Sequence, residues 1–381
     1  MRKTFGLREY CLASLSVWLT CQASLRSAEN ISPVVDVFVG GQEGFPTYRI
    51  PAIIKSGKGN LLAFAEGRAS RGDHSRNKLV LKRSADQGHT WEKLQIIDDA
   101  GQECLNNPTA VLDRDSGKII LMYQRYPIAF DEKNVVEGLN GDRICRTFVM
   151  ESSDEGQMWS KPQEITATVK RPTGATSLAS GPGIGIQLMW GFHSGRILIP
   201  FNQGPPGHWQ VYAAFSDDHG KTWHYGDLAP EDQYTGANEV QMVELADGQV
   251  LLNARNQAGS HQRRVAYSHD GGQTWSTLAD EPLLIEPKCQ ASLIRHSLDA
   301  DPHHDVLIFS NPASTQARTN GTIRLSVDEG KTWKSSRVLY PRSFAYSCLV
   351  SLDSSTVGCL FERDGYSKIS FQTMTLDWIN H

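Results

Sequence analysis

The chain has 381 residues, of which 39% are hydrophobic and 21% charged, a composition typical of ordinary globular proteins. Its formal net charge is −4 and no basic stripe stands out, so the composition gives no support to nucleic-acid binding. An anionic ligand would have to be held by local positive charge, because the chain as a whole does not attract it.

The first 28 residues are typical of a secretory signal peptide. Arg2, Lys3 and Arg8 give a basic start, and a short apolar run follows over 11–19. Small residues offer cleavage sites near positions 23 and 28. The apolar run is too short to span a membrane, so we expect no transmembrane span in the mature chain. We therefore expect export to the periplasm or out of the cell, with an N-terminal or lipid anchor as the alternative.

From position 34 to position 381, short apolar runs alternate with turns rich in Gly, Pro, Asn and Asp. Examples are the runs over 60–65, 118–123 and 249–253, which follow turns that contain glycine. No segment keeps a 3.6-residue apolar period over three turns, as an amphipathic helix would. The sequence therefore predicts one all-β domain over 34–381.

One pattern, Ser-x-Asp-x-Gly-x-Thr-Trp, is repeated along this domain. Its copies, called Asp boxes below, span 84–91, 152–159, 216–223, 268–275 and 326–333, and only the second copy departs from it, with Met158 in place of Thr. Strand-like runs flank the copies, which predicts hairpins in which Asp bonds to backbone N–H groups and Gly takes a positive φ. The Trp would then pack against the sheet. The oxygen-rich spacing of a calcium loop is missing, which favours a structural role.

The spacing of the boxes predicts the architecture. Successive copies are 52 to 68 residues apart with about four strands between them, which is typical of the blades of a β-propeller. Five boxes and the strand-bearing segment from Ser335 onward predict six blades, the last without a box. In such a ring every loop lies on one of two end faces. We expect the boxes on one face, and the longer, functional loops on the other.

Cysteine usage indicates no cross-linked or zinc-stabilised fold. Five cysteines lie after the predicted leader: Cys104, Cys145, Cys289, Cys348 and Cys359. Their number is odd and no CxxC spacing occurs, so neither a disulfide framework nor a zinc site is predicted. We expect small buried side chains, with a single bridge as the alternative.

Three arginines lie beside apolar strands, where a purely structural role is awkward. They are Arg49, Arg255 and Arg318, and they belong to three different predicted blades. Planar guanidinium groups that meet at the propeller axis would fix a carboxylate firmly. Each arginine taken singly also fits a solvated surface position, and spacing does not decide between the two interpretations.

Besides the five boxes, the chain contains five further motifs in a fixed order: Tyr48–Pro51, Glu66–Arg68, Gly181–Leu188, Glu239–Gln241 and Ala345–Ser347. Together with the boxes, these motifs resemble those of the exo-α-sialidases, or neuraminidases, of the bacterial and animal type. The likeness runs from about position 38 to position 378. The box occurs in other propellers as well, whereas the whole set in this order is specific.

The resemblance implies a catalytic set of Asp73, Glu239 and Tyr346. Sialic acid carries a carboxylate on its anomeric carbon, which would repel an attacking carboxylate, and sialidases are known to use Tyr instead. Glu239 would activate the phenol of Tyr346, whose ordinary pKa is about 10. Asp73 would protonate the leaving oxygen and then deprotonate water. This chemistry requires no metal and no cofactor.

The resemblance also implies substrate-binding residues. The arginine triad that binds the sialic acid carboxylate falls on Arg49, Arg255 and Arg318. Arg324 competes for the third place, but it lies in the strand before the fifth box and is interpreted as a blade residue.

Three further positions complete the predicted site. Glu362 would steady the first arginine of the triad, and Arg68 matches a residue that reaches the 4-hydroxyl region of the sugar. Asn107 matches a position that is often Asp, which would leave it a hydrogen-bonding role without charge. The loop over 204–209 contains Trp209, a candidate for an aromatic wall.

The expected function is hydrolysis of terminal α-linked sialic acid from glycans, glycoproteins or glycolipids. The resemblance implies retention of configuration through a covalent sialosyl-tyrosine intermediate, and we expect a monomer. Two enzymatic alternatives share the site, trans-sialidase and intramolecular trans-sialidase activity. A propeller that only binds glycans or proteins would lack one or more of Asp73, Glu239 and Tyr346, and all three are present.

Overall fold

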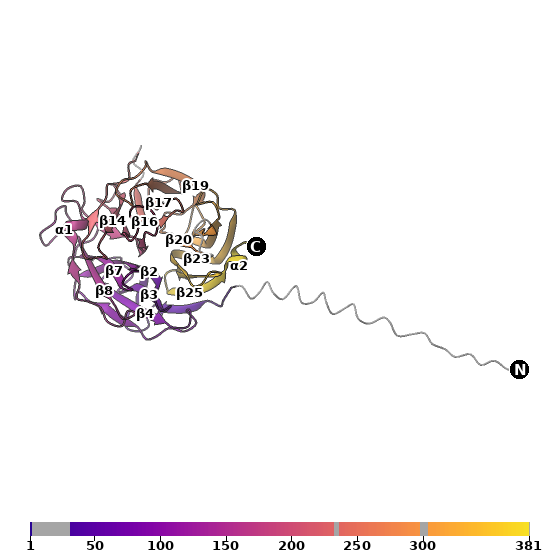
Figure 1. The fold of residues 1–381 in the computed structure, drawn as a ribbon. Helices are drawn as coiled ribbons and strands as arrows, with labels where there is room; N and C mark the ends of the chain where they lie inside the picture. Colours follow the sequence, from indigo (N-terminus) through magenta and orange to yellow (C-terminus); the bar gives the residue numbers. More distant parts are fainter. Residues whose placement is uncertain (2–30, 232–235, 298–303, 381) are drawn as a thin grey trace.

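The structure is a computed structural model that describes residue 1 and residues 31–231, 236–297 and 304–380. The predicted signal peptide or anchor falls almost wholly on residues outside this set. Antiparallel sheets surround a common centre, with β2, β16, β20 and β23 near the middle and β4, β8 and β19 towards the periphery (Figure 1). This is the architecture of a β-propeller, and the all-β prediction is confirmed.

Two of the sheets have four strands each, joined in sequence order. One contains β2 (Thr47–Lys55), β3 (Leu61–Arg68), β4 (Lys78–Ser84) and β5 (Gln95–Asp98). The other contains β16 (Ala237–Glu244), β17 (Val250–Asn256), β18 (Gln262–Ser268) and β19 (Ala279–Ile285).

Two further sheets have a fifth, short strand added to the same meander. One contains β6 (Cys104–Leu112), β7 (Ile119–Tyr126), β8 (Arg146–Ser152) and β9 (Gln163–Glu164), with β11 (Gly183–Ile184) parallel to β6. The other contains β10 (Leu178–Ser180), β12 (Ile186–Gln187), β13 (Ile197–Gln203), β14 (Gln210–Ser216) and β15 (His224–Tyr225). A one-turn helix, α1 (Thr166–Val169), follows β9.

The last sheet has seven strands in the order β1-β25-β24-β23-β22-β21-β20. These are β1 (Val35–Val39), β20 (Ser292–His296), β21 (Val306–Pro312), β22 (Thr319–Ser326), β23 (Ser335–Ser351), β24 (Thr356–Arg363) and β25 (Lys368–Thr375), followed by α2 (Leu376–Asn380).

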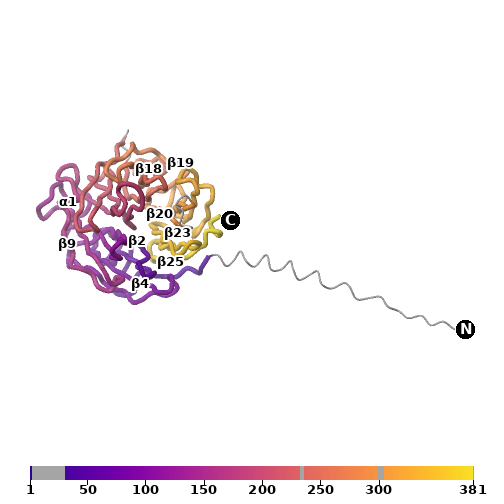
Figure 2. Tube along the Cα trace, viewed as in Figure 1, coloured from indigo at the N-terminus to yellow at the C-terminus, as the bar shows by residue number. Residues whose placement is uncertain are grey.

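The long strand β23 connects two four-stranded halves of this sheet. It pairs with β22 as far as Ser343 and with β24 from Phe344 onward. A count of six blades requires the sheet to be divided at this point, so the blade number stays a prediction. The N-terminal strand β1 pairs with β25, so the two ends of the described chain complete one sheet (Figure 2).

The Asp-box hairpins adopt the predicted turn. In the box over 216–223, the Ser216 hydroxyl donates to Asp218 over 2.8 Å and accepts from the Gly220 N–H over 2.9 Å. Thr222 donates to Asp218 through its N–H (2.8 Å) and its hydroxyl (2.7 Å). Gly220 has φ +82°, and a Cβ there would lie 2.6 Å from a methyl group of Ile120, so no other residue fits.

The other four boxes repeat this geometry, with one exception. The box glycines have φ between +75° and +90°. In the second box Met158 supplies its N–H to Asp154 over 2.9 Å but has no hydroxyl to add. The box tryptophans Trp223, Trp275 and Trp333 are buried against the sheets, as the sequence predicted.

The core lies between neighbouring sheets and fixes their order around the ring. A typical cluster joins Leu62 and Leu81 of one sheet with Leu121 and Met150 of the next. The five cysteines within the described residues are buried and free, so the interpretation of them as small apolar side chains is confirmed. Neither helix of the described residues has the length and apolar character that a membrane span needs.

Candidate active site

A pocket of about 290 Å³ lies where the innermost strands of the sheets begin. Eight of the nine residues predicted for the site line it: Arg49, Arg68, Asp73, Asn107, Glu239, Arg255, Arg318 and Tyr346. The ninth, Glu362, lies behind the pocket and is fully buried. Because neighbouring strands run antiparallel, the turns that carry the boxes lie at the opposite end of the sheets. The pocket and the boxes therefore occupy different faces, as expected.

Irregularities interrupt the innermost strands at four of these pocket residues. The pairing register shifts between Arg49 and Ala52 in β2, and between Asn106 and Thr109 in β6. Two more shifts fall at positions 238–240 of β16 and 344–347 of β23, which contain Glu239 and Tyr346. A β-bulge re-aims the side chain that it carries, and bulges recur beside active sites. Regular strands in the same positions would turn alternate side chains into the core.

The Tyr346 hydroxyl donates a hydrogen bond to Glu239, and this contact forms the centre of the site. Arg255 donates to Glu239 over 2.7 Å, and the same nitrogen lies 3.3 Å from the Tyr346 hydroxyl. Burial and then the Glu239 carboxylate raise the pKa of Tyr346 well above its usual value, although Arg255 and Arg318 act in the opposite direction. The phenol is therefore neutral, and it becomes a nucleophile only when a base takes its proton.

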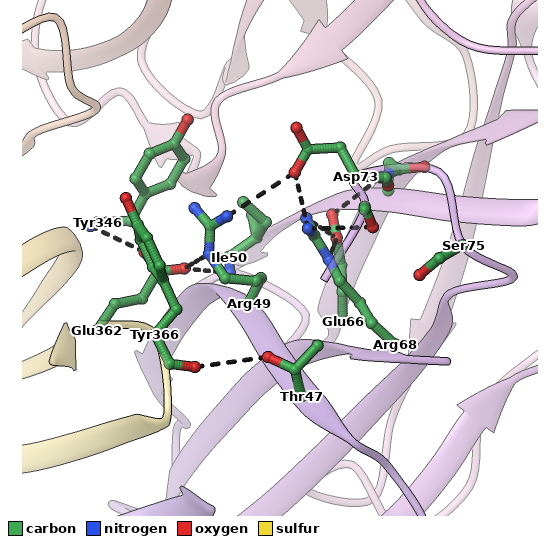
Figure 3. Close-up of polar contacts among 12 residues, drawn as sticks. Thr47, Arg49, Ile50, Glu66, Arg68, Asp73, Ser75, Tyr346, Glu362 and Tyr366 are labelled. Atoms are coloured by element: carbon green, nitrogen blue, oxygen red, sulfur yellow. Dashed lines mark hydrogen bonds and ion pairs between the residues drawn. The ribbon is translucent and has the colours of Figure 1, made fainter. Parts of the chain in front are cut away.

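Arg49 is held by a buried carboxylate behind it. Its Nε donates to Glu362 over 2.6 Å, and the same carboxylate accepts the backbone N–H groups of Ile50 (2.9 Å) and Tyr346 (3.2 Å). Ile50 has φ +62°, a strained conformation for a β-branched residue, and the bond from its N–H offsets part of that strain. Figure 3 shows the Arg49 side chain between Glu362 and Asp73.

Arg318 reaches the pocket from the loop before β22. It donates to the Tyr366 hydroxyl over 3.2 Å and to the carbonyl of Lys288 over 3.0 Å. The guanidinium carbons of Arg49 and Arg318 lie 5.2 Å and 5.4 Å from the centre of the Tyr346 ring. Positive charge thus surrounds the phenol on more than one side.

Arg324, the alternative to Arg318 in the arginine triad, does not line the pocket. It is buried within its blade, where it donates to Asn311 over 2.9 Å. Burial lowers the pKa of Arg324 to about 10.

Asp73 and Arg68 form an ion pair on the other side of the pocket. Arg68 donates to Asp73 over 2.7 Å and to Glu66 through two other nitrogens, at 2.6 Å and 2.8 Å. Desolvation acts to raise the pKa of Asp73, but Arg68 and then Arg49 outweigh it and hold that pKa below its usual value. The Asp73 side chain is 69% exposed, so solvent and substrate can reach it.

Glu66 belongs to the motif Glu66–Arg68, but the sequence predicted no role for it. Its carboxylate is fully buried and accepts the backbone N–H of Asn107 over 2.8 Å, besides its two bonds from Arg68. Asn107 has φ +57°, so this bond holds a residue in the left-handed region. Asn106 and Asn77 both donate to the carbonyl of Asp73, over 2.8 Å and 2.7 Å.

Other pocket residues were missed because no motif marks them. Glu132 lines the pocket from the long connection between β7 and β8, and His74 and Tyr126 line the pocket as well. Burial and then the charges of Asp73 and Glu239 raise the pKa of Glu132. Trp209 lines the pocket, as suggested for its loop.

One group of side chains among the described residues has the spacing of metal ligands. Ligand atoms of Asp113, Asp115 and His219 lie within 4.8 Å of one another. The buried Asp113 carboxylate already accepts hydrogen bonds from Ser116 and Gln187. None of the three residues is among those that line the pocket.

Comparisons with known proteins place the chain in a family. Residues 59–359 match the family described as a BNR repeat-like domain. The chain is 36% identical over 363 residues to a sialidase of Micromonospora viridifaciens, in an alignment that covers 90% of this chain and 54% of that protein. It is 31% identical over 360 residues to sialidase-2 of Rattus norvegicus, with 86% of this chain and 92% of the relative covered.

A solved structure has the same fold over most of the chain. The structure described as the Hadza microbial sialidase Hz136 matches with a TM-score of 0.82 at 30% identity, over 91% of this chain and 69% of that one. The fold and the site thus define a β-propeller of the BNR-repeat class. Within that class, the chain belongs to the sialidase family. It spans about half of the length of the Micromonospora sialidase and nearly all of the rat protein.

Proposed function

We propose that the protein is an exo-α-sialidase, a glycoside hydrolase that removes terminal α-linked sialic acid from glycans, glycoproteins or glycolipids with retention of configuration. The observation that carries this proposal is the hydrogen bond from Tyr346 to Glu239 inside a pocket that Arg49, Arg255 and Arg318 also line. A phenol with a carboxylate base beside it can attack an anomeric centre that already bears a negative charge.

Substrate binding begins with the arginines. The sialic acid carboxylate would lie against Arg49, Arg255 and Arg318, whose charges are otherwise only partly balanced by Glu362 and Glu239. This placement puts the anomeric carbon next to the Tyr346 hydroxyl, which converts the attack into an intramolecular step.

The first chemical step forms the covalent intermediate. Glu239 takes the phenolic proton as the Tyr346 oxygen bonds to the anomeric carbon, and the bond from that carbon to the leaving oxygen breaks. Asp73 gives its proton to the leaving oxygen. Since Asp73 is ionised in the free site, it must gain this proton with the substrate. Charge neutralisation at Arg49 by the bound carboxylate favours that uptake.

The second step releases the sugar. Asp73, now a carboxylate, takes a proton from water as the water oxygen bonds to the anomeric carbon. The bond to Tyr346 breaks, and the phenolate recovers its proton from Glu239. Two displacements at the same carbon give overall retention.

Turnover of a fluorogenic α-sialoside by the purified protein tests the proposal. We expect the parent protein to cleave it, and Tyr346→Phe and Asp73→Ala to lose about two orders of magnitude or more in kcat/KM. A parent protein without turnover would contradict the proposal. NMR analysis of the products separates release to water from transfer to a sugar hydroxyl or to a hydroxyl of the substrate itself.

Trapping tests the nucleophile directly. A 3-fluoro-sialosyl fluoride should label one residue per chain, and peptide mapping should find the label on Tyr346. A label on another residue would refute the role of Tyr346 while leaving the hydrolase assignment open to the turnover assay.

A further inference from the structure

A short segment between β19 and β20 contacts several parts of the site from behind. The segment spans residues 286–290, and none of them is among the described residues that line the pocket. It starts with Glu286, whose side chain is fully buried. Lys288, in its middle, has φ +58°, so the backbone holds a turn that most residues disfavour.

The Glu286 carboxylate accepts three hydrogen bonds. They come from the backbone N–H of Asn256 (2.6 Å), the backbone N–H of Cys289 (3.0 Å) and the guanidinium of Arg263 (3.2 Å). Arg263 is fully buried as well, and it also donates to the Cys289 carbonyl (2.8 Å) and to Asn253 (2.7 Å). The ion pair thus ties the end of β17 to both sides of the 286–290 turn.

Through these bonds the segment reaches two arginines of the triad. Asn256 directly follows Arg255, so a fixed N–H at Asn256 also fixes the peptide plane that Arg255 shares with it. The Lys288 carbonyl accepts from Arg318 over 3.0 Å. The position of that carbonyl depends on the turn that Glu286 closes.

The same segment also supports the phenol. Cys289 packs in one buried cluster with Ile50 and Tyr346. Gln290 exchanges two hydrogen bonds with the backbone of Ser347, the residue after Tyr346, each 3.0 Å long. Four of the five residues of the segment therefore contact a site residue or its immediate neighbour.

We propose that Glu286 is a positioning residue of the catalytic site, which with Arg263 holds residues 286–290 in the form that orients Arg255, Arg318 and Tyr346. This inference deepens the proposed function and rests on it. It assigns a role in the reaction to a buried ion pair that touches no substrate.

Glu286→Gln tests the inference because the amide has one acceptor oxygen where the carboxylate has two. Its NH₂ group must face either the Asn256 N–H or both the Cys289 N–H and the Arg263 guanidinium, so at least one of the three donors loses its partner and moves. A misplacement of about 1 Å in a catalytic group is enough to lower a rate by about 100-fold. We expect kcat/KM for the fluorogenic α-sialoside to fall about 10-fold to 100-fold.

Asp305→Asn is the matched control. Asp305 is a buried carboxylate that accepts from Arg295 over 2.9 Å, and it is not among the residues that line the pocket. We expect its kcat/KM to stay within about twofold of the parent value at a temperature where both variants are folded. The number of sites labelled by 3-fluoro-sialosyl fluoride should remain one per chain in Glu286→Gln, with a slower labelling rate.

Two results would overturn the inference. One is a Glu286→Gln variant with the turnover and labelling rate of the Asp305→Asn control. The other is a lower number of labelled sites with an unchanged rate at each, which indicates partial unfolding alone. If Glu286→Gln does not fold, Glu286→Asp keeps the charge beside Arg263 but cannot span both N–H groups, and the same criteria apply. A parent protein without turnover would instead refute the proposed function itself.

Discussion

Arg68 donates to Asp73 over 2.7 Å, whereas the nearest nitrogen of Arg49 lies 3.8 Å from the same carboxylate oxygen. Arg68 is almost fully buried and is also bound to Glu66, so it cannot move away from Asp73 without losing an ion pair. The free site therefore keeps its proposed general acid in the ionised form. The proton must arrive with the substrate, and the pH dependence of the reaction should record this.

Arg68→Gln should move the pH profile of kcat/KM. Without the guanidinium, the pKa of Asp73 rises, because the charge that favoured its ionised form has gone. Asp73 then stays protonated to higher pH, so the descending limb of the profile moves to higher pH. The maximum kcat/KM falls. Arg71→Gln removes a charge from the exposed loop that contains Asp73 and should leave the limb in place. An unshifted limb in Arg68→Gln would show that Arg68 does not control Asp73.

Glu239→Gln should separate activation of the phenol from its placement. The amide oxygen can still accept the Tyr346 hydrogen bond, but it cannot hold the phenolic proton. We expect kcat to fall by about 100-fold to 10,000-fold, the usual effect of losing a general base. The rate at which 3-fluoro-sialosyl fluoride labels Tyr346 would measure the loss in the step that forms the covalent intermediate. A variant within tenfold of the parent would mean that another group takes the proton.

Asn107→Ala and Asn107→Gly should differ in stability and agree in activity. Both lose the amide that lines the pocket, and both should raise KM by the same factor. Asn107 has φ +57°, so Ala adds strain of about 1–2 kcal/mol that Gly avoids. Thermal unfolding would place Asn107→Ala below Asn107→Gly. Equal melting temperatures would argue against a backbone role for this position.

Met158→Thr should stabilise the fold. The new hydroxyl can donate to Asp154 as the threonines of the other boxes do to theirs, and Met158 is 73% exposed, so little burial is lost. The gain of one hydrogen bond is about 0.5–1 kcal/mol, or about 1–2 °C in melting temperature for a domain of this size. Thr222→Val removes the equivalent hydroxyl and should have the opposite sign. A neutral Met158→Thr beside a destabilising Thr222→Val would contradict this account.

The sequence allowed the frame to be predicted because its signals are local. A box turn is specified by the Ser, Asp and Gly within its own eight residues, and alternating turns and apolar runs specify short strands. The family resemblance added positions for the site, and eight of the nine residues line one pocket. Arg318 rather than Arg324 lies there, as the position of Arg324 within a strand suggested.

The residues that hold the site in shape are not marked by any local sequence pattern. Nothing in the residues around Ile50 marks a positive φ, and Asn107 is only a residue type that tolerates one. Both bulges depend on carboxylates that come from other strands. Glu286 is similarly ordinary in sequence, and its partners Asn256 and Arg263 are 30 and 23 residues away. Glu132 reaches the pocket through a long connection whose course depends on packing. Such placements follow only from the assembled ring.

The pairing of β1 with β25 has a consequence for how the ring can be cut. Ile31 bridges to Met374 and Val35 pairs with Phe371, so the first and last described strands are neighbours in one sheet. The two ends of the ring are thus joined by ordinary antiparallel strand pairing. The fold therefore does not require the chain to begin at this particular blade. A short linker from position 380 to position 31, with new ends opened in an exposed loop, would give a circularly permuted chain with the bulges beside the pocket intact.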